Sequence, residues 1–328
     1  MTVNHHLEQF HGLPVFDFVQ ALEAAEAAGP TDGAGPAPLP DAAAVAWRIR
    51  LDYESERTWP ERWQQFLEAV DTERVAALVI GQWAPDEPDS FREPLEAVVA
   101  AAPRLPALRA LFAGDVTYEE CEISWIQQCD VTPLLTAFPA LAELVVRGAS
   151  EDWEGQGGLA LQPLRHEALK ALRFEAGGLP ATVVRAVAGC EFPALERLEL
   201  WLGVDNYGGD ATIGDLTPFL DGTGLPALRH LGLQNCEFQD EIAAALAHAP
   251  VVARLESLNL SMGVLTDQGA AALLEGQPLT HLRALDLHHH YLTEEMQQRL
   301  RQALPGVDLD LTEAGKPDDR WRYVAVAE

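Results

Sequence analysis

The chain has 328 residues, of which 48% are hydrophobic, and its 22 Lys and Arg against 51 Asp and Glu give a formal net charge of −29. Such a negative surface repels polyanions, so the composition argues against nucleic acid and anionic membranes as partners. The four cysteines have no metal-type spacing, the N-terminus has no signal-type apolar run and no stretch is long enough to span a bilayer, which together predict a cytoplasmic protein with reduced thiols.

Residues 1–43 are predicted to form an N-terminal cap and a loop. Residues 10–19, FHGLPVFDFV, are apolar enough to pack on a first repeat, whose open edge needs protection from water and from strand pairing. A Gly/Pro-rich loop with little capacity for order follows at 29–40. A targeting or regulatory segment is the alternative interpretation.

Two segments concentrate the negative charge. Residues 52–96 hold twelve carboxylates and four arginines, and residues 115–130 hold five carboxylates and no Lys or Arg. A solvated outer face explains such clusters most simply. The alternative is an acidic inhibitor or immunity-type surface that docks a basic partner.

Residues 44–311 carry a repeated leucine pattern, L-x-x-L-x-L-x-x-(C/G/H)-x-L, with substitutions. Weaker copies lie at 44–54, 75–83 and 307–311. Successive clear copies are 33, 28, 26, 33, 27 and 27 residues apart. The clear copies begin at Leu108, Leu141, Leu169, Leu195, Leu228, Leu255 and Leu282.

Within each repeat, apolar residues are first two positions apart and then about 3.6 positions apart on average. This change predicts a strand followed by a helix. Examples of the helical part are TDQGAAALLEG after Leu265 and TEEMQQRLRQAL after Leu292. Helix starts are expected at the N-cap residues Thr132, Thr217, Thr266 and Thr293, the first two of which precede a proline. Strands stack at about 4.8 Å and helices at about 8–10 Å, so about eight to ten parallel strands should line the inside of an arc.

These features resemble leucine-rich-repeat proteins of the ribonuclease-inhibitor-like class, over roughly residues 71–311. The resemblance is carried by the period of 26 to 28 residues and by LTDQGAAALLEG, and it implies an α/β solenoid with strands inside. The 33-residue units imply longer loops near 85–91, 115–130 and 203–215. The layout from FHGLPVFDF to RWRYVAVAE also resembles an uncharacterised bacterial leucine-rich-repeat family, which implies no activity of its own.

Outward-pointing strand residues should form rows on the concave wall. A tryptophan among charged pairs is typical of interface hot spots, so we expect a protein or peptide to bind there. The alternative is that cross-strand Arg–Glu pairs only neutralise one another. The predicted contact residues are Arg147, Arg173, Glu175, Arg197, Glu199, Trp201, His230, Gln234, Asn259, Asp286 and His288.

No nucleotide-binding, hydrolase or zinc-protease motif is present, so we expect a non-catalytic scaffold without a cofactor. The Gly-rich run at 205–215 contains three Asp and no Lys, which is more typical of a long repeat loop than of a phosphate cradle. Within His288–His290, alternation should place His288 on the inner face and His290 at a turn. A metal held by His288 and Asp286 is conceivable, so the alternative is an enzyme, or an accessory subunit of one, using the His288 or 203–215 region.

Residues 312–328 are predicted to form a C-terminal cap. The run KPDDRWRYVAVAE could add a final short strand, with Trp321 and Tyr323 covering the last turn. A regulatory tail is the alternative.

Overall fold

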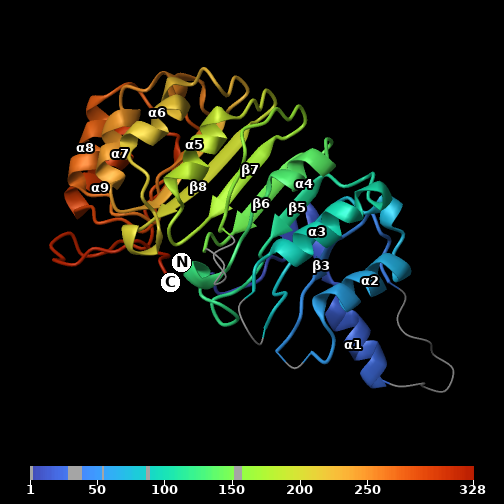
Figure 1. The fold of residues 1–328 in the computed structure, drawn as a ribbon. Coiled ribbons are helices and arrows are strands. Elements are labelled where there is room, and N and C mark those ends of the chain that lie inside the picture. The colour runs from blue at the N-terminus through green and yellow to red at the C-terminus, as the bar shows by residue number, and fades with distance from the viewer. Residues whose placement is uncertain (1–2, 29–38, 54, 86–88, 151–156) are drawn as a thin grey trace.

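The computed structural model describes residues 3–28, 39–53, 55–85, 89–150 and 157–328. Within them, one unclosed sheet of twelve strands follows the chain order from end to end. The sheet is curved, with helices on its outer side (Figure 1). This arrangement is a leucine-rich-repeat-like α/β solenoid, as the sequence predicts.

β1 and β2 are antiparallel, and each later neighbouring pair is parallel. The strands are β1 (Gln9–Phe10), β2 (Leu13–Asp17), β3 (Ala46–Ile49), β4 (Ala77–Ile80), β5 (Ala110–Ala113), β6 (Glu143–Arg147), β7 (Ala171–Glu175), β8 (Arg197–Gly203), β9 (His230–Cys236), β10 (Ser257–Asn259), β11 (Ala284–Asp286) and β12 (Asp308–Asp310).

Helices supply most of the crossovers that parallel strands need. The helices are α1 (Phe18–Ala28), α2 (Trp59–Ala69), α3 (Arg92–Ala100), α4 (Thr132–Ala137), α5 (Ala181–Gly189), α6 (Ile213–Asp221), α7 (Gln239–Leu246), α8 (Asp267–Glu275) and α9 (Glu294–Ala303). Between β6 and β7, the described part of the connection contains no helix. No helix in the described ranges combines the length and apolar character needed to cross a bilayer.

One leucine from each repeat forms a continuous column in the core. Leu198, Leu231, Leu258 and Leu285 are paired in register across β8 to β11, and all are buried. A single strand cannot bury this side chain alone, so each repeat depends on its neighbours. The predicted stacking is confirmed.

The helix starts agree only partly with the sequence. Thr266 and Thr293 are N-caps whose side chains accept backbone hydrogen bonds, as predicted. The expected start at Thr217 is wrong, because α6 has its N-cap five residues earlier, at Thr212, which forms a capping box with Asp215. Thr132 is the first residue of α4 rather than its N-cap.

The two ends of the sheet also differ from expectation. β1 and β2 lie before residue 44, so the sheet has more strands than the eight to ten expected. The predicted loop at 29–40 falls mostly outside the described residues, as do 86–88 of the loop near 85–91. Past β12, no further strand forms, and Trp321 and Tyr323 are 76% and 65% exposed instead of covering the last turn.

Candidate functional site

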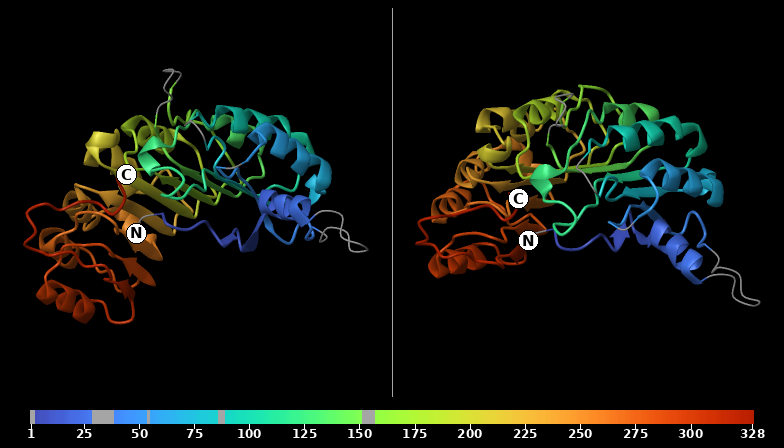
Figure 2. Two further views of the ribbon diagram at one scale, coloured as in Figure 1. Left: turned by 90° about the horizontal axis from the view of Figure 1, so that it is seen from below. Right: turned by 60° about the horizontal axis from the view of Figure 1, so that its bottom comes forward.

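The N-terminal residues 3–11, here called the arm, lie on the concave face of the sheet (Figure 2). Leu7 and Phe10 belong to a second apolar cluster, on the side of the sheet opposite the main core. The residues that β2 to β6 contribute to this cluster are Leu13, Val15, Ala46, Ala77, Val79, Ala110, Phe112 and Val145. The concave face of β3 to β6 is therefore covered by the chain itself.

Ionic contacts fix the arm in place. His6 lies between Asp115 and Glu120, with its Nε2 3.1 Å from Glu120 Oε1 and its Nδ1 3.4 Å from Asp115 Oδ2. Burial alone would lower the pKa of His6, but the hydrogen bonds and charges of these two carboxylates raise it to about 9. Arg48 pairs with the fully buried Asp115 at 2.7 Å and also donates to the carbonyl oxygen of Leu7.

A series of ion pairs continues from the arm along the concave face. Arg147 lies 3.7 Å from Asp115 and donates from Nε to Glu175 Oε2 at 2.6 Å. Arg173 then bridges Glu175 at 3.0 Å and Glu199 at 3.5 Å. The Arg–Glu pairs expected from the sequence thus exist, and both partners of the Arg147–Glu175 pair are buried on the concave side.

Glu199 is at the centre of the next part of this series of ion pairs. Its carboxylate lies 3.0 Å from Arg197 Nη1 and 2.8 Å from His230 Nε2. Burial raises the pKa of Glu199, but the hydrogen bond from His230 and the charges of Arg173, His230 and Arg197 outweigh it and lower the pKa to about 2. Glu199 is therefore ionised at neutral pH and holds the surrounding cations in place.

Part of this region is open to solvent. The Arg197 side chain is 52% exposed, and Trp201 is half-buried. Trp201 pairs in register with Gln234, and in the part of the chain that the structure describes neither the indole Nε1 nor the amide Oε1 has a hydrogen-bond partner. The predicted contact residues of β6 to β9 therefore do lie together, but several are buried.

The remaining predicted residues lie at the C-terminal end of the face. Asn259 donates to Asp286 Oδ2 at 3.1 Å, and His288 Nδ1 lies 2.8 Å from Asp286 Oδ1. His290 faces the interior, where its ring bonds the carbonyl of Leu311 and the amide of Leu292. The predicted turn role of His290 is confirmed.

The C-terminal residues 323–328 run back along the carboxyl ends of the strands, a feature missed by the sequence reasoning. Ala325 donates to the carbonyl of Met262 at 2.8 Å, and Val326 donates to Asn235 Oδ1 at 3.0 Å. Asn235 has φ of 54°, a left-handed conformation that asparagine tolerates well. Figure 2 shows the segment returning from the last repeats toward the middle of the arc.

The acidic loops are largely occupied by contacts within the chain. In the 203–215 loop, Asp210 accepts from the amide of Ala181 at 2.7 Å, and Asp215 caps α6 and pairs with Arg185 at 2.8 Å. The same holds for Asp115 and Glu120 of the 115–130 segment, which hold His6. These carboxylates serve structural roles.

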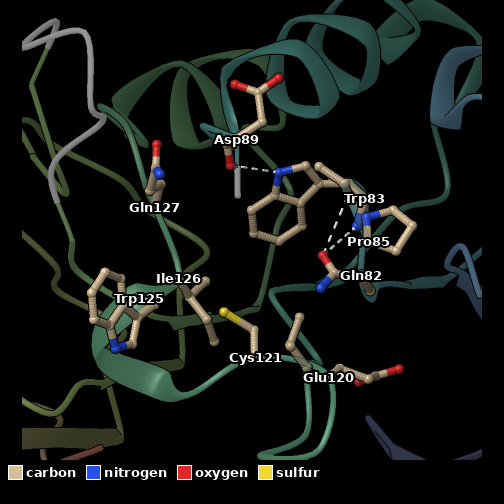
Figure 3. Close-up of a pocket in the computed structure, with 11 residues that line it drawn as sticks. Gln82, Trp83, Pro85, Asp89, Glu120, Cys121, Trp125, Ile126 and Gln127 are labelled. Atoms are coloured by element: carbon tan, nitrogen blue, oxygen red, sulfur yellow. Dashed lines mark hydrogen bonds between the residues drawn. The ribbon is translucent and has the colours of Figure 1, made fainter. Parts of the chain in front are cut away.

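A small cavity of about 50 Å³ lies beside the loops that follow β4 and β5 (Figure 3). Trp83, Cys121 and Trp125 line it, and Trp83 Nε1 donates to the carbonyl of Asp89 at 2.9 Å. Burial and the nearby Glu122 and Glu120 raise the pKa of Cys121 to about 11. The thiol is thus protonated at neutral pH, and the cavity has room for water.

No protein-family model and no curated protein matches the chain. A crystal structure of a Bacteroides fragilis protein is similar, with a TM-score of 0.74 and 28% identity over 85% of this chain and 76% of that one. An internalin from Listeria monocytogenes is much less similar, with a TM-score of 0.35 and 13% identity over 85% of this chain and 77% of that one. The stacked strand-and-helix repeats themselves identify the chain as a leucine-rich-repeat-like α/β solenoid protein.

Proposed function

We propose that this chain is a non-catalytic scaffold that binds a protein or peptide on the concave face of β7 to β11. One observation carries the proposal: the arm covers the concave face of β3 to β6, whereas on β8 the Arg197 side chain is 52% exposed and Trp201 is only half-buried. Ion pairs already fix the charged side chains there, so less conformational entropy is lost when a partner binds.

The predicted contact residues divide into two groups by burial. Arg173, Arg197, Trp201, Asn259 and Asp286 are exposed or half-buried and are proposed to touch the partner. A second group is buried or nearly so and is proposed to position the first: Arg147, Glu175, Glu199, His230, Gln234 and His288.

The domain division suggested by the sequence stays part of the proposal. Residues 1–43 and 312–328 are proposed to protect the two ends of the solenoid at 44–311, and the protein is proposed to be cytoplasmic. The inhibitor alternative receives support from the net charge of −29, but Asp115 and Glu120 are engaged within the chain.

Affinity capture with matched variants tests the binding face. Trp201→Ala is compared with Trp321→Ala, which removes an exposed tryptophan at the C-terminal end. Arg197→Glu is compared with Arg299→Glu on the exposed side of α9. A partner recovered by the native protein should be retained by both controls and lost by both concave-face variants. Equal recovery by all five proteins would exclude this face.

A further inference from the structure

A compact group of possible metal ligands lies at the C-terminal end of the concave face. Asp286 of β11 pairs in register with Asp310 of β12. The ladder continues past β11 through the hydrogen bond from the His289 amide to the carbonyl of Thr312, so His288 points to the same side as Asp286. One ligand atom from each of Asp286, His288 and Asp310 lies within 4.8 Å of the other two.

His288 differs from the structural histidine next to it. Both ring nitrogens of His290 are bonded to backbone groups. His288 is only 9% exposed, its Nδ1 faces the Asp286 carboxylate at 2.8 Å, and its Nε2 is buried without a hydrogen-bond partner among the described residues. Leaving a buried polar atom without a hydrogen bond is unfavourable, and this ring is directed toward carboxylate oxygens rather than a carbonyl.

The two carboxylates of the group also lack a fixed cation. Elsewhere on the face, Asp115, Glu175 and Glu199 each contact an arginine within 4.0 Å. Across the described ranges, neither Asp286 nor Asp310 forms an ion pair with Lys or Arg; Asp286 accepts from Asn259 and Asp310 from Thr312. This end of the face therefore concentrates negative charge that a bound cation would neutralise.

We propose that Asp286, His288 and Asp310 bind one divalent transition-metal ion, of the Zn²⁺, Co²⁺ or Mn²⁺ type. An imidazole together with two carboxylates suits these ions, whereas Ca²⁺ and Mg²⁺ prefer oxygen ligands alone. Three protein ligands leave at least one coordination position for water or for a group of the bound partner. This metal site goes beyond the proposed partner binding. The chain itself supplies all three ligands, so the ion can bind when no partner is present.

Metal binding to the purified full-length protein tests this directly. Titration calorimetry with ZnCl₂, and absorption spectra with CoCl₂, are measured for the native protein, Asp310→Asn and His288→Gln. The matched controls are Asp308→Asn, an exposed carboxylate two residues before Asp310, and His289→Gln, the histidine beside His288. Circular dichroism of each variant shows whether it remains folded.

The native protein should bind about one equivalent, with the dissociation constant raised about tenfold or more in Asp310→Asn and His288→Gln and unchanged in the controls. Absence of binding by the native protein at millimolar metal, or an equal loss in Asp308→Asn, would overturn the site. Because no partner is present, this outcome is independent of the concave-face proposal. Capture of the partner with and without a chelator then shows whether the ion takes part in recognition.

Discussion

Arg147 of β6 and Glu175 of β7 form a 2.6 Å ion pair across the concave face, and both residues are buried. Arg147 also lies 3.7 Å from Asp115, which contacts the arm, whereas Glu175 contacts Arg173 at the open part of the face. The pair therefore connects the covered half of the concave face to the half proposed to bind a partner.

Removing the acid of this pair should destabilise the protein. Glu175→Ala leaves the guanidinium of Arg147 buried without its closest counter-ion, and we expect the free energy of unfolding to fall by about 3 kcal/mol. Urea denaturation measures the loss. The double variant Arg147→Met, Glu175→Leu should lose much less, and a single-variant loss below about 1 kcal/mol would contradict a buried, coupled pair.

The stability supplied by His6 should depend on pH. Its pKa is raised to about 9 in the folded chain, above the ordinary value of about 6.5, so its contribution is complete below pH 6.5 and lost as the pH rises through 9. Denaturation at pH 6 to 10 should show this decrease in the native protein and a flatter profile in His6→Gln. Identical profiles would mean that His6 is not paired with Asp115 and Glu120.

The C-terminal segment should depend on Asn235. Asn235→Gly keeps the left-handed backbone but removes the side-chain hydrogen bonds to Val326, so stability should fall by about 1–3 kcal/mol. Hydrogen exchange at the Val326 amide should become faster. The substitution should have little effect in a chain already lacking residues 324–328, and an equal effect there would show that Asn235 acts by another route.

The leucine column gives a prediction about the core. Leu231→Ala opens a cavity between the repeats of β8 and β10, and we expect a loss of about 2–5 kcal/mol by urea denaturation. Leu274→Ala, at a half-buried position on α8, is the control and should cost less. Equal costs would argue against a tightly packed column at Leu231.

The repeat itself could be predicted because its signals are the spacings of residues that are close together in the sequence. Leucines two apart fix a strand, and Thr266 and Thr293 mark helix starts by residue type. The prediction at Thr217 rests on its Thr-Pro pair and is wrong, because Thr212 and Asp215 form the capping box of α6. Such signals involve only a few neighbouring residues, so strands and helix starts can be predicted from them without a structure.

The use of the concave face could not be predicted in the same way. Two contacts join residues about ninety or more positions apart in the sequence: Phe10 with Phe112, and Val326 with Asn235. No local sequence pattern predicts such contacts. The sequence correctly grouped Arg147 with Glu175, because repeat spacing places them on adjacent strands. Their burial involves contacts that the spacing does not show, such as those of Arg147 with Asp115 and with the carbonyl of Val116.

The most direct test of the proposed binding face is photo-crosslinking from the face itself. A photoreactive amino acid is placed at position 201 on β8 and, as a control, at the exposed position 298 on the outer helix α9. We predict a crosslinked complex with the recovered partner from position 201, suppressed by excess unlabelled native protein, and none from position 298. A complex formed from position 298 and not from position 201 would contradict partner binding on the concave face.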